Sequence, residues 1–96
     1  MTDEKDHEKK GEPIVEVTYL KTNKEVRFHV EWTNTLQFVW DKAYDELHEK
    51  KVADDKFECS DGNLLTAYLD DTLEQLREKK ICVDRKYQIH GPTGGA

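Results

Sequence analysis

The sequence predicts an α+β fold in which one main helix packs on a mixed sheet of four to five strands. Three observations indicate this class: an early pair of alternating apolar and polar runs, one longer segment with helical periodicity, and a strand-like run near the C-terminal end. Strand and helix patterns mix along the chain without strict βαβ alternation, which favours an α+β roll over a parallel α/β sheet.

The first two predicted strands form an antiparallel hairpin. Apolar and polar residues alternate from Ile14 onward, and the alternation resumes after the polar residues 21–24. The apolar face of the second run consists of Val26, Phe28, Val30 and Trp32. A period of two with β-branched and aromatic residues is the signal of a strand. Asn23 in the connector tolerates the left-handed conformation that a tight hairpin needs.

The main helix is predicted over about residues 35–51, because apolar residues there recur at the i, i+3, i+4, i+7 spacing of one helical face. The predicted buried stripe is Leu36, Val39, Trp40, Ala43, Tyr44 and Leu47. We expect Asn34 to be the N-cap, with Gln37 as its reciprocal partner. Among the aromatic residues Trp32, Trp40, Tyr44 and Phe57 are expected in the core. Phe38 lies between the apolar stripe and the charged face, so we expect it to be partly exposed and available to a partner.

Shorter elements complete the domain. Residues 56–59 are predicted to form a short strand, and Asp61-Gly62 after it is a tight-turn signal. Thr72 to Gln75 has the T-x-x-Q form of a capping box and predicts a short helical turn. Residues 86–90 alternate again and form the last predicted strand.

The chain divides into three predicted parts. Residues 1–12 contain five acids, three lysines and one histidine, too few apolar groups to offset the entropy of ordering, so we predict a disordered leader. Residues 13–91 form the predicted domain, and residues 92–96 a flexible C-terminal tail. The tail ends in Gly94-Gly95-Ala96. Because glycine lacks Cβ, such a tail can lie extended in a narrow channel of another protein.

Charge and composition limit the classes of partner. The 15 basic and 21 acidic residues give a net charge of −6, which argues against nucleic acid and anionic membranes as partners. No apolar run approaches the ~20 residues of a membrane span. No apolar signal-peptide core is visible near the N-terminus. We therefore expect a monomeric, cytoplasmic protein.

The sequence predicts neither catalysis nor a bound cofactor or metal. It contains no G-x-S-x-G, P-loop, H-E-x-x-H or glycine-rich dinucleotide motif. Its two cysteines, Cys59 and Cys82, belong to no C-x-x-C pair and have no histidine at a ligand-like spacing. In a reducing cytosol we expect them to be free thiols, and a disulfide between them requires that the fold bring them together.

The element order and the glycine pair resemble the ubiquitin-like β-grasp family over roughly residues 13–95. Asn23 stands where the first β-turn of the family usually has glycine. The segments that carry the resemblance are residues 19–25, 33–36, 71–76 and 89–95. The last of these resembles the final strand and conjugation tail of the family. The acidic, lysine-rich leader and the terminal alanine look most like bacterial ubiquitin-like proteins.

The resemblance implies a protein modifier that is attached to target amines through Gly95, or through Ala96. An E1-like enzyme would activate the terminal carboxylate, an E2-like enzyme would carry it, and a deconjugating peptidase would release it. Removal of Ala96 would precede activation unless the enzymes accept a terminal alanine. The tail departs from the family pattern because it lacks the arginine that usually precedes the glycine pair.

The receptor-binding surface also departs from the eukaryotic archetype, which uses an apolar patch on the outer face of its sheet. The outward positions here are Glu58, Gln88 and His90, so we expect a polar partner surface. Two alternatives to a protein modifier stay open. One is a non-covalent β-grasp module or subunit of a larger complex, and the other is a sulfur carrier. Ala96 counts against the sulfur carrier, because those carriers end at the glycine pair.

Overall fold

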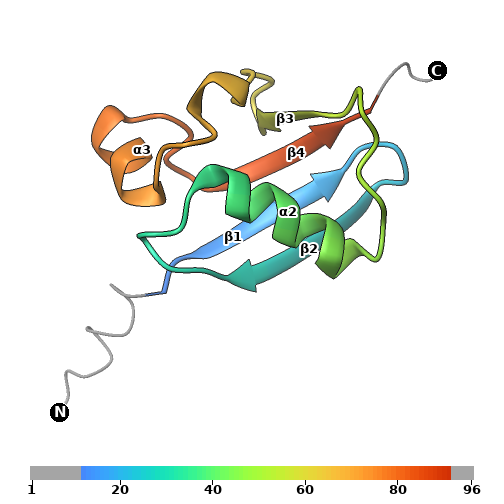
Figure 1. Cartoon of the computed structure of the whole chain (residues 1–96), viewed down its shortest axis with the longest axis horizontal. Coiled ribbons are helices and arrows are strands. Elements are labelled where there is room, and N and C mark those ends of the chain that lie inside the picture. Colours follow the sequence, from blue (N-terminus) through green and yellow to red (C-terminus); the bar gives the residue numbers. More distant parts are fainter. Residues whose placement is uncertain (1–11, 92–96) are drawn as a thin grey trace, which may run out of the picture.

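A four-stranded mixed sheet with one helix lying across one of its faces makes up most of the computed structural model, which describes residues 12–91 (Figure 1). The α+β class with one main helix is therefore confirmed. The predicted leader lies outside the described residues except for Glu12. The predicted tail, with Gly94, Gly95 and Ala96, lies outside them entirely.

The sheet has the strand order β2-β1-β4-β3 within residues 12–91. Strand β1 (Ile14–Tyr19) pairs antiparallel with β2 (Lys24–His29) and parallel with β4 (Lys86–His90). Strand β3 (Lys56–Cys59) pairs antiparallel with β4. The two strands farthest apart in the sequence thus lie side by side at the centre of the sheet (Figure 1). A fifth strand is not formed in this part of the chain, because Leu64 makes only an isolated bridge to Glu58.

The turn of the first hairpin follows the sequence prediction. Asn23 has a φ of 61°, and its backbone N–H donates to the carbonyl oxygen of Tyr19 at 2.7 Å. Asparagine tolerates this left-handed conformation better than most residues. The predicted Asp61-Gly62 turn is also present, with a φ of 94° at Gly62.

Helix α2 (Leu36–Leu47) buries the predicted apolar stripe, but both of its ends differ from the prediction. Thr35 is the N-cap, and its hydroxyl accepts from the backbone N–H of Phe38 at 3.2 Å. Asn34 instead accepts from the backbone N–H of Glu31. The helix ends before residue 51 because His48 is left-handed. The next positions on the apolar face, residues 50 and 51, are lysines with nothing to bury.

Two short helices follow β3: the 3-10 turn η1 (Thr66–Tyr68) and α3 (Leu73–Lys79). The capping box predicted at Thr72 and Gln75 is confirmed in both of its hydrogen bonds. The start of α3 is joined to the start of α2 by an isolated bridge between Thr35 and Thr72. None of the helices within residues 12–91 combines the length and the apolar content that crossing a membrane requires.

The core lies between the sheet and α2. Three aromatic rings stack through it, with Phe57 5.4 Å from Trp40 and 5.2 Å from Tyr87 between ring centroids. The prediction that Trp32 belongs to the core is correct only in part, because this residue is half-buried at the edge. The guanidinium groups of Arg77 and Arg85 lie 4.6 Å and 5.4 Å from its ring and cover it there.

Candidate functional site

The C-terminal strand β4 is the best-anchored part of the backbone near the predicted tail. It is hydrogen-bonded to β1 on one side and to β3 on the other. Tyr87 and Ile89 are buried in the core, and the backbone N–H of Leu20 donates to the carbonyl oxygen of Ile89 at 3.1 Å. The strand ends at His90, and Gly91 is the last described residue. The position from which residues 92–96 continue is therefore fixed by a central strand.

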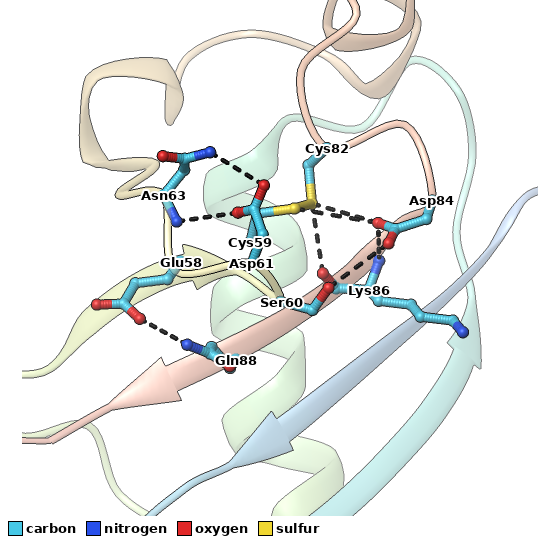
Figure 2. Close-up of a disulfide and its surroundings, with 9 residues drawn as sticks. All are labelled: Glu58, Cys59, Ser60, Asp61, Asn63, Cys82, Asp84, Lys86 and Gln88. Atoms are coloured by element: carbon cyan, nitrogen blue, oxygen red, sulfur yellow. Dashed lines mark hydrogen bonds between the residues drawn. A yellow bond between two sulfur atoms is a disulfide. The ribbon is translucent and has the colours of Figure 1, made fainter.

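The three polar residues predicted as a partner surface, Glu58, Gln88 and His90, are brought together beside this strand end. Glu58 and Gln88 are directly opposite each other in the β3–β4 register. The Gln88 amide donates to Glu58 Oε1 at 2.7 Å (Figure 2), and His90 Nδ1 lies 3.2 Å from Glu58 Oε2. We call these residues the outer-face cluster. Its groups satisfy one another, so it presents hydrogen-bonding groups rather than an apolar surface.

Charged residues continue the same face of the sheet toward the N-terminal hairpin. Arg27 Nη2 lies 3.2 Å from Glu16 Oε1. A hydrogen bond between the Glu16 and Glu25 carboxyl groups lowers the pKa of Glu16 and raises the pKa of Glu25. The polar character expected of this face thus extends beyond the outer-face cluster.

Phe38, the fourth predicted partner residue, is not part of this cluster. It belongs to α2, which covers the opposite face of the sheet (Figure 1). Its exposed fraction is 44%, which confirms the predicted exposure. Phe38 and Lys42 together line two shallow, open hollows. The residues completing the first hollow include the acids Asp41, Asp45 and Glu49.

A buried polar chain beside Gly91 was not predicted. Trp40 Nε1 donates to the Tyr44 hydroxyl oxygen at 3.0 Å, and that hydroxyl donates to Asp55 Oδ2 at 2.6 Å. The pKa of Tyr44 is raised, mainly because the hydroxyl is buried and secondly because it donates to Asp55. Asp55 Oδ1 has no hydrogen-bond partner within residues 12–91, and a Cβ added at Gly91 would lie 3.4 Å from it. In the sequence Asp55 looks like an ordinary loop acid, and no local pattern distinguishes it.

The expectation of free thiols is wrong, because Cys59 and Cys82 form a disulfide (Figure 2). The bond joins the end of β3 to the loop of residues 80–85 that leads into β4. Its Cα atoms are 5.6 Å apart although the residues are separated by 23 positions. Only the packing of β3 against β4 brings these ends together, so their spacing in the sequence gave no signal. Disulfides are typical of oxidising compartments, and the cytoplasmic location stays a prediction.

Comparison with known proteins identifies no family for this chain. No protein-family model matches the sequence, and the search of curated proteins returns no significant relative.

Proposed function

We propose that this protein is a ubiquitin-like protein modifier with a β-grasp fold. The sequence resemblance described above is one support. The other is the arrangement of a parallel central pair, β1 and β4, between β2 and β3, with α2 across one face. This arrangement is compatible with a β-grasp. The proposal includes E1-like, E2-like and deconjugating enzymes as partners, and it assigns the protein no catalysis of its own.

The observation that carries the proposal is the anchoring of β4 up to Gly91. A modifier must present its flexible terminal segment from a fixed point, so that one enzyme after another can reach the end. Hydrogen bonds on both sides of β4 and the buried side chains of Tyr87 and Ile89 provide such a base. The residues that follow are Pro92-Thr93-Gly94-Gly95-Ala96. None of them has a large side chain, and only Thr93 is branched at the β-carbon. They therefore suit a narrow enzyme channel.

The proposed chemistry uses only the terminal carboxylate of this chain. That carboxylate attacks the α-phosphate of ATP, and an acyl adenylate forms as pyrophosphate leaves. A cysteine thiolate of the activating enzyme then displaces AMP and forms a thioester. A lysine amine of the target finally attacks the thioester carbonyl and forms an amide, and the proton that the nitrogen loses passes to the departing thiolate, which leaves as a thiol.

The outer-face cluster is the proposed docking surface next to the tail. Glu58 is almost fully buried, with an exposed fraction of 9%, whereas the His90 side chain is largely exposed. A partner enzyme would therefore contact His90 and Gln88 first and would recognise them by hydrogen bonds. Receptors that read an apolar patch on the sheet would find no such patch at these three positions. The net charge of −6 would speed association with a basic enzyme surface.

Mass spectrometry of the protein expressed in its native cells tests the proposal. The chain has no lysine or arginine after Lys86. Trypsin would therefore leave residues 87–95 or 87–96 as one remnant on a target lysine. We expect this branched peptide, and its mass also decides whether Ala96 is removed. A variant that ends at Thr93 should form no branched peptide, whereas Phe38→Ala should form it normally. An unattached terminus under all growth conditions would contradict the proposal.

A second candidate function, a non-covalent interaction module, is favoured by Phe38. This side chain is exposed beside Asp41 and Asp45 on one face of α2. An exposed aromatic ring among acids suits a partner that presents an apolar side chain flanked by lysine or arginine. Under this function, Phe38→Ala would abolish capture of the partner, and the variant ending at Thr93 would still capture it. The two variants thus give opposite results for the two functions.

A further inference from the structure

We propose that Cys59, Cys82 and Asp84 form a zinc site when the disulfide is reduced. This end of the sheet would then hold either a disulfide or a metal ion. The inference does not depend on the modifier function, and it differs from the sequence-based expectation that the chain has no metal site.

The three donor side chains already converge. Asp84 Oδ1 lies 3.6 Å from Cys82 Sγ and 4.0 Å from Cys59 Sγ (Figure 2). One ligand atom from each residue lies within 4.8 Å of the others. The convergence joins the end of β3 to the loop of residues 80–85, so no short sequence motif encodes it.

Asp84 is held in place by contacts from the neighbouring backbone and side chains. Its Oδ1 accepts from the backbone N–H of Lys86 at 3.1 Å, and its Oδ2 accepts from the Ser60 hydroxyl at 3.5 Å. Such contacts orient a ligating carboxylate in the way that outer contacts orient the ligands of known metal sites. The site therefore supplies a fixed oxygen donor beside two sulfur atoms.

While the disulfide is intact, the contact between the Asp84 carboxylate and the two sulfur atoms includes no hydrogen bond. Bonded sulfur atoms carry no hydrogen, so neither sulfur can donate a hydrogen bond to Asp84 in this state. In the reduced state, a cation bound by both sulfur atoms and this oxygen would add an attraction that the disulfide does not offer. Two thiolates and a carboxylate are a donor set that suits Zn²⁺.

The required geometry is close to the observed one. With zinc–sulfur bonds near 2.3 Å and zinc–oxygen bonds near 2.1 Å, a tetrahedral ion separates sulfur and oxygen ligands by about 3.6 Å. The same geometry separates the two sulfurs by about 3.8 Å. The carboxylate is thus nearly in position, and the sulfurs must move apart once their bond is broken. Water would occupy the fourth position, because Asp84 is exposed to solvent.

The exchange between the two states balances with a dithiol as the reductant. The dithiol transfers two electrons and two protons to the Cys59–Cys82 bond and becomes a disulfide itself. Two thiols result, and each loses its proton to the buffer when its sulfur binds zinc. Metal binding must therefore release protons and weaken at acidic pH. In the reverse step a small disulfide accepts the two electrons and two protons and becomes a dithiol, the Cys59–Cys82 bond forms again, and the ion is released.

Titration of the reduced full-length protein with Zn²⁺ under anaerobic conditions, against a chromogenic chelator, tests this proposal. We expect one ion per chain in the reduced protein and at least about tenfold weaker binding in the oxidised protein. Substitution by Co²⁺ should give a thiolate-to-metal charge-transfer band. In the wild-type protein, Zn²⁺ should also protect both thiols from alkylation, a result that depends on no variant.

Two aspartate variants distinguish a three-ligand site from simple thiol binding. Asp84→Asn should weaken Zn²⁺ binding by about tenfold or more. Asp61→Asn removes the same charge from the same end of the sheet, but the Asp61 carboxylate accepts from Asn63 (Figure 2) and does not belong to the group of three converging donors. It should change binding by no more than about twofold, because exposed charges are screened. Circular dichroism would confirm that both variants are folded.

The proposal would be overturned by a reduced protein that binds no Zn²⁺, by thiols that are alkylated equally fast with and without Zn²⁺, or by equal binding by Asp84→Asn and the wild type. Equal binding by the reduced and oxidised proteins would also contradict it, because the disulfide removes both thiolates.

Discussion

The two faces of the sheet are stabilised by different interactions, although adjacent residues of the same strands contribute to them. Phe57 and Glu58 are neighbours in β3, yet Phe57 stacks between Trp40 and Tyr87 under α2, and Glu58 accepts from Gln88 on the opposite face. Both side chains are almost fully buried. The inner face removes apolar surface from water, which is strongly favourable. The outer face replaces hydrogen bonds to water with hydrogen bonds between side chains, which contributes much less.

The largest expected effect comes from breaking the inner face at Phe57. Phe57→Ala should destabilise the fold by about 3–5 kcal/mol, because it removes a fully buried ring and leaves a cavity between two aromatic neighbours. Urea unfolding followed by circular dichroism would measure the change. A loss below about 1 kcal/mol would mean that the stack of three rings contributes little to stability.

The disulfide secures the edge of the inner face, since Cys59 follows Glu58 and belongs to the core. Replacing both cysteines by serine should lower the free energy of unfolding by about 3 kcal/mol, the value expected when a loop of this length is no longer closed in the unfolded chain. Thermal unfolding with and without a dithiol reductant would measure it. The double serine variant is the control, because a reductant should leave its melting temperature unchanged.

Alkaline pH should also act on the inner face. Burial raises the pKa of both Tyr44 and Tyr87 above the ordinary value of 10.0. A tyrosine whose folded-state pKa is raised contributes full stability below pH 10 and loses it as the pH rises toward the folded-state value. Because each tyrosine ionises more easily in the unfolded chain, each should lower the free energy of unfolding by about 1.4 kcal/mol per pH unit above about pH 10.

Tyr87→Phe sharpens this test, because it removes one titrating group and keeps the ring. Unfolding measured from about pH 9 to about pH 11 should show a shallower loss of stability in the variant than in the wild type. Parallel curves would show that Tyr87 ionises as easily in the folded protein as in the unfolded chain.

The smallest expected effect is on the outer face. Glu58→Ala removes the acceptor for Gln88 and the contact with His90, and it should cost about 1 kcal/mol. The same urea unfolding as for Phe57→Ala would measure it, so that two adjacent residues of one strand are compared directly. Destabilisation equal to that of Phe57→Ala would erase the proposed difference between the faces.

Much of the local structure was predictable from the sequence. Asn23 and Gly62 have the left-handed backbone that their turns require, and Thr72 and Gln75 form the expected capping box. The predicted exposure of Phe38 is also correct. These features depend on residues within a few positions of one another, whose preferences a sequence pattern records directly. The helix start was misassigned by one residue, because Asn34 and Thr35 are both competent caps and only the packed structure selects between them.

The inward-facing side chains of each strand could be predicted from the amino-acid sequence, because alternation along a strand is a local property of the backbone. Which strands are neighbours follows only from the packing of the whole chain. The order of the strands places β4 at the centre of the sheet and joins Cys59 to Cys82. It also brings Glu58 into contact with Gln88 and His90, which are 30 and 32 positions away in the sequence. Burial stabilises an apolar face whichever apolar partner covers it, so it does not select the neighbouring strands. A specific contact forms only after the whole sheet has fixed the distances between residues far apart in the sequence.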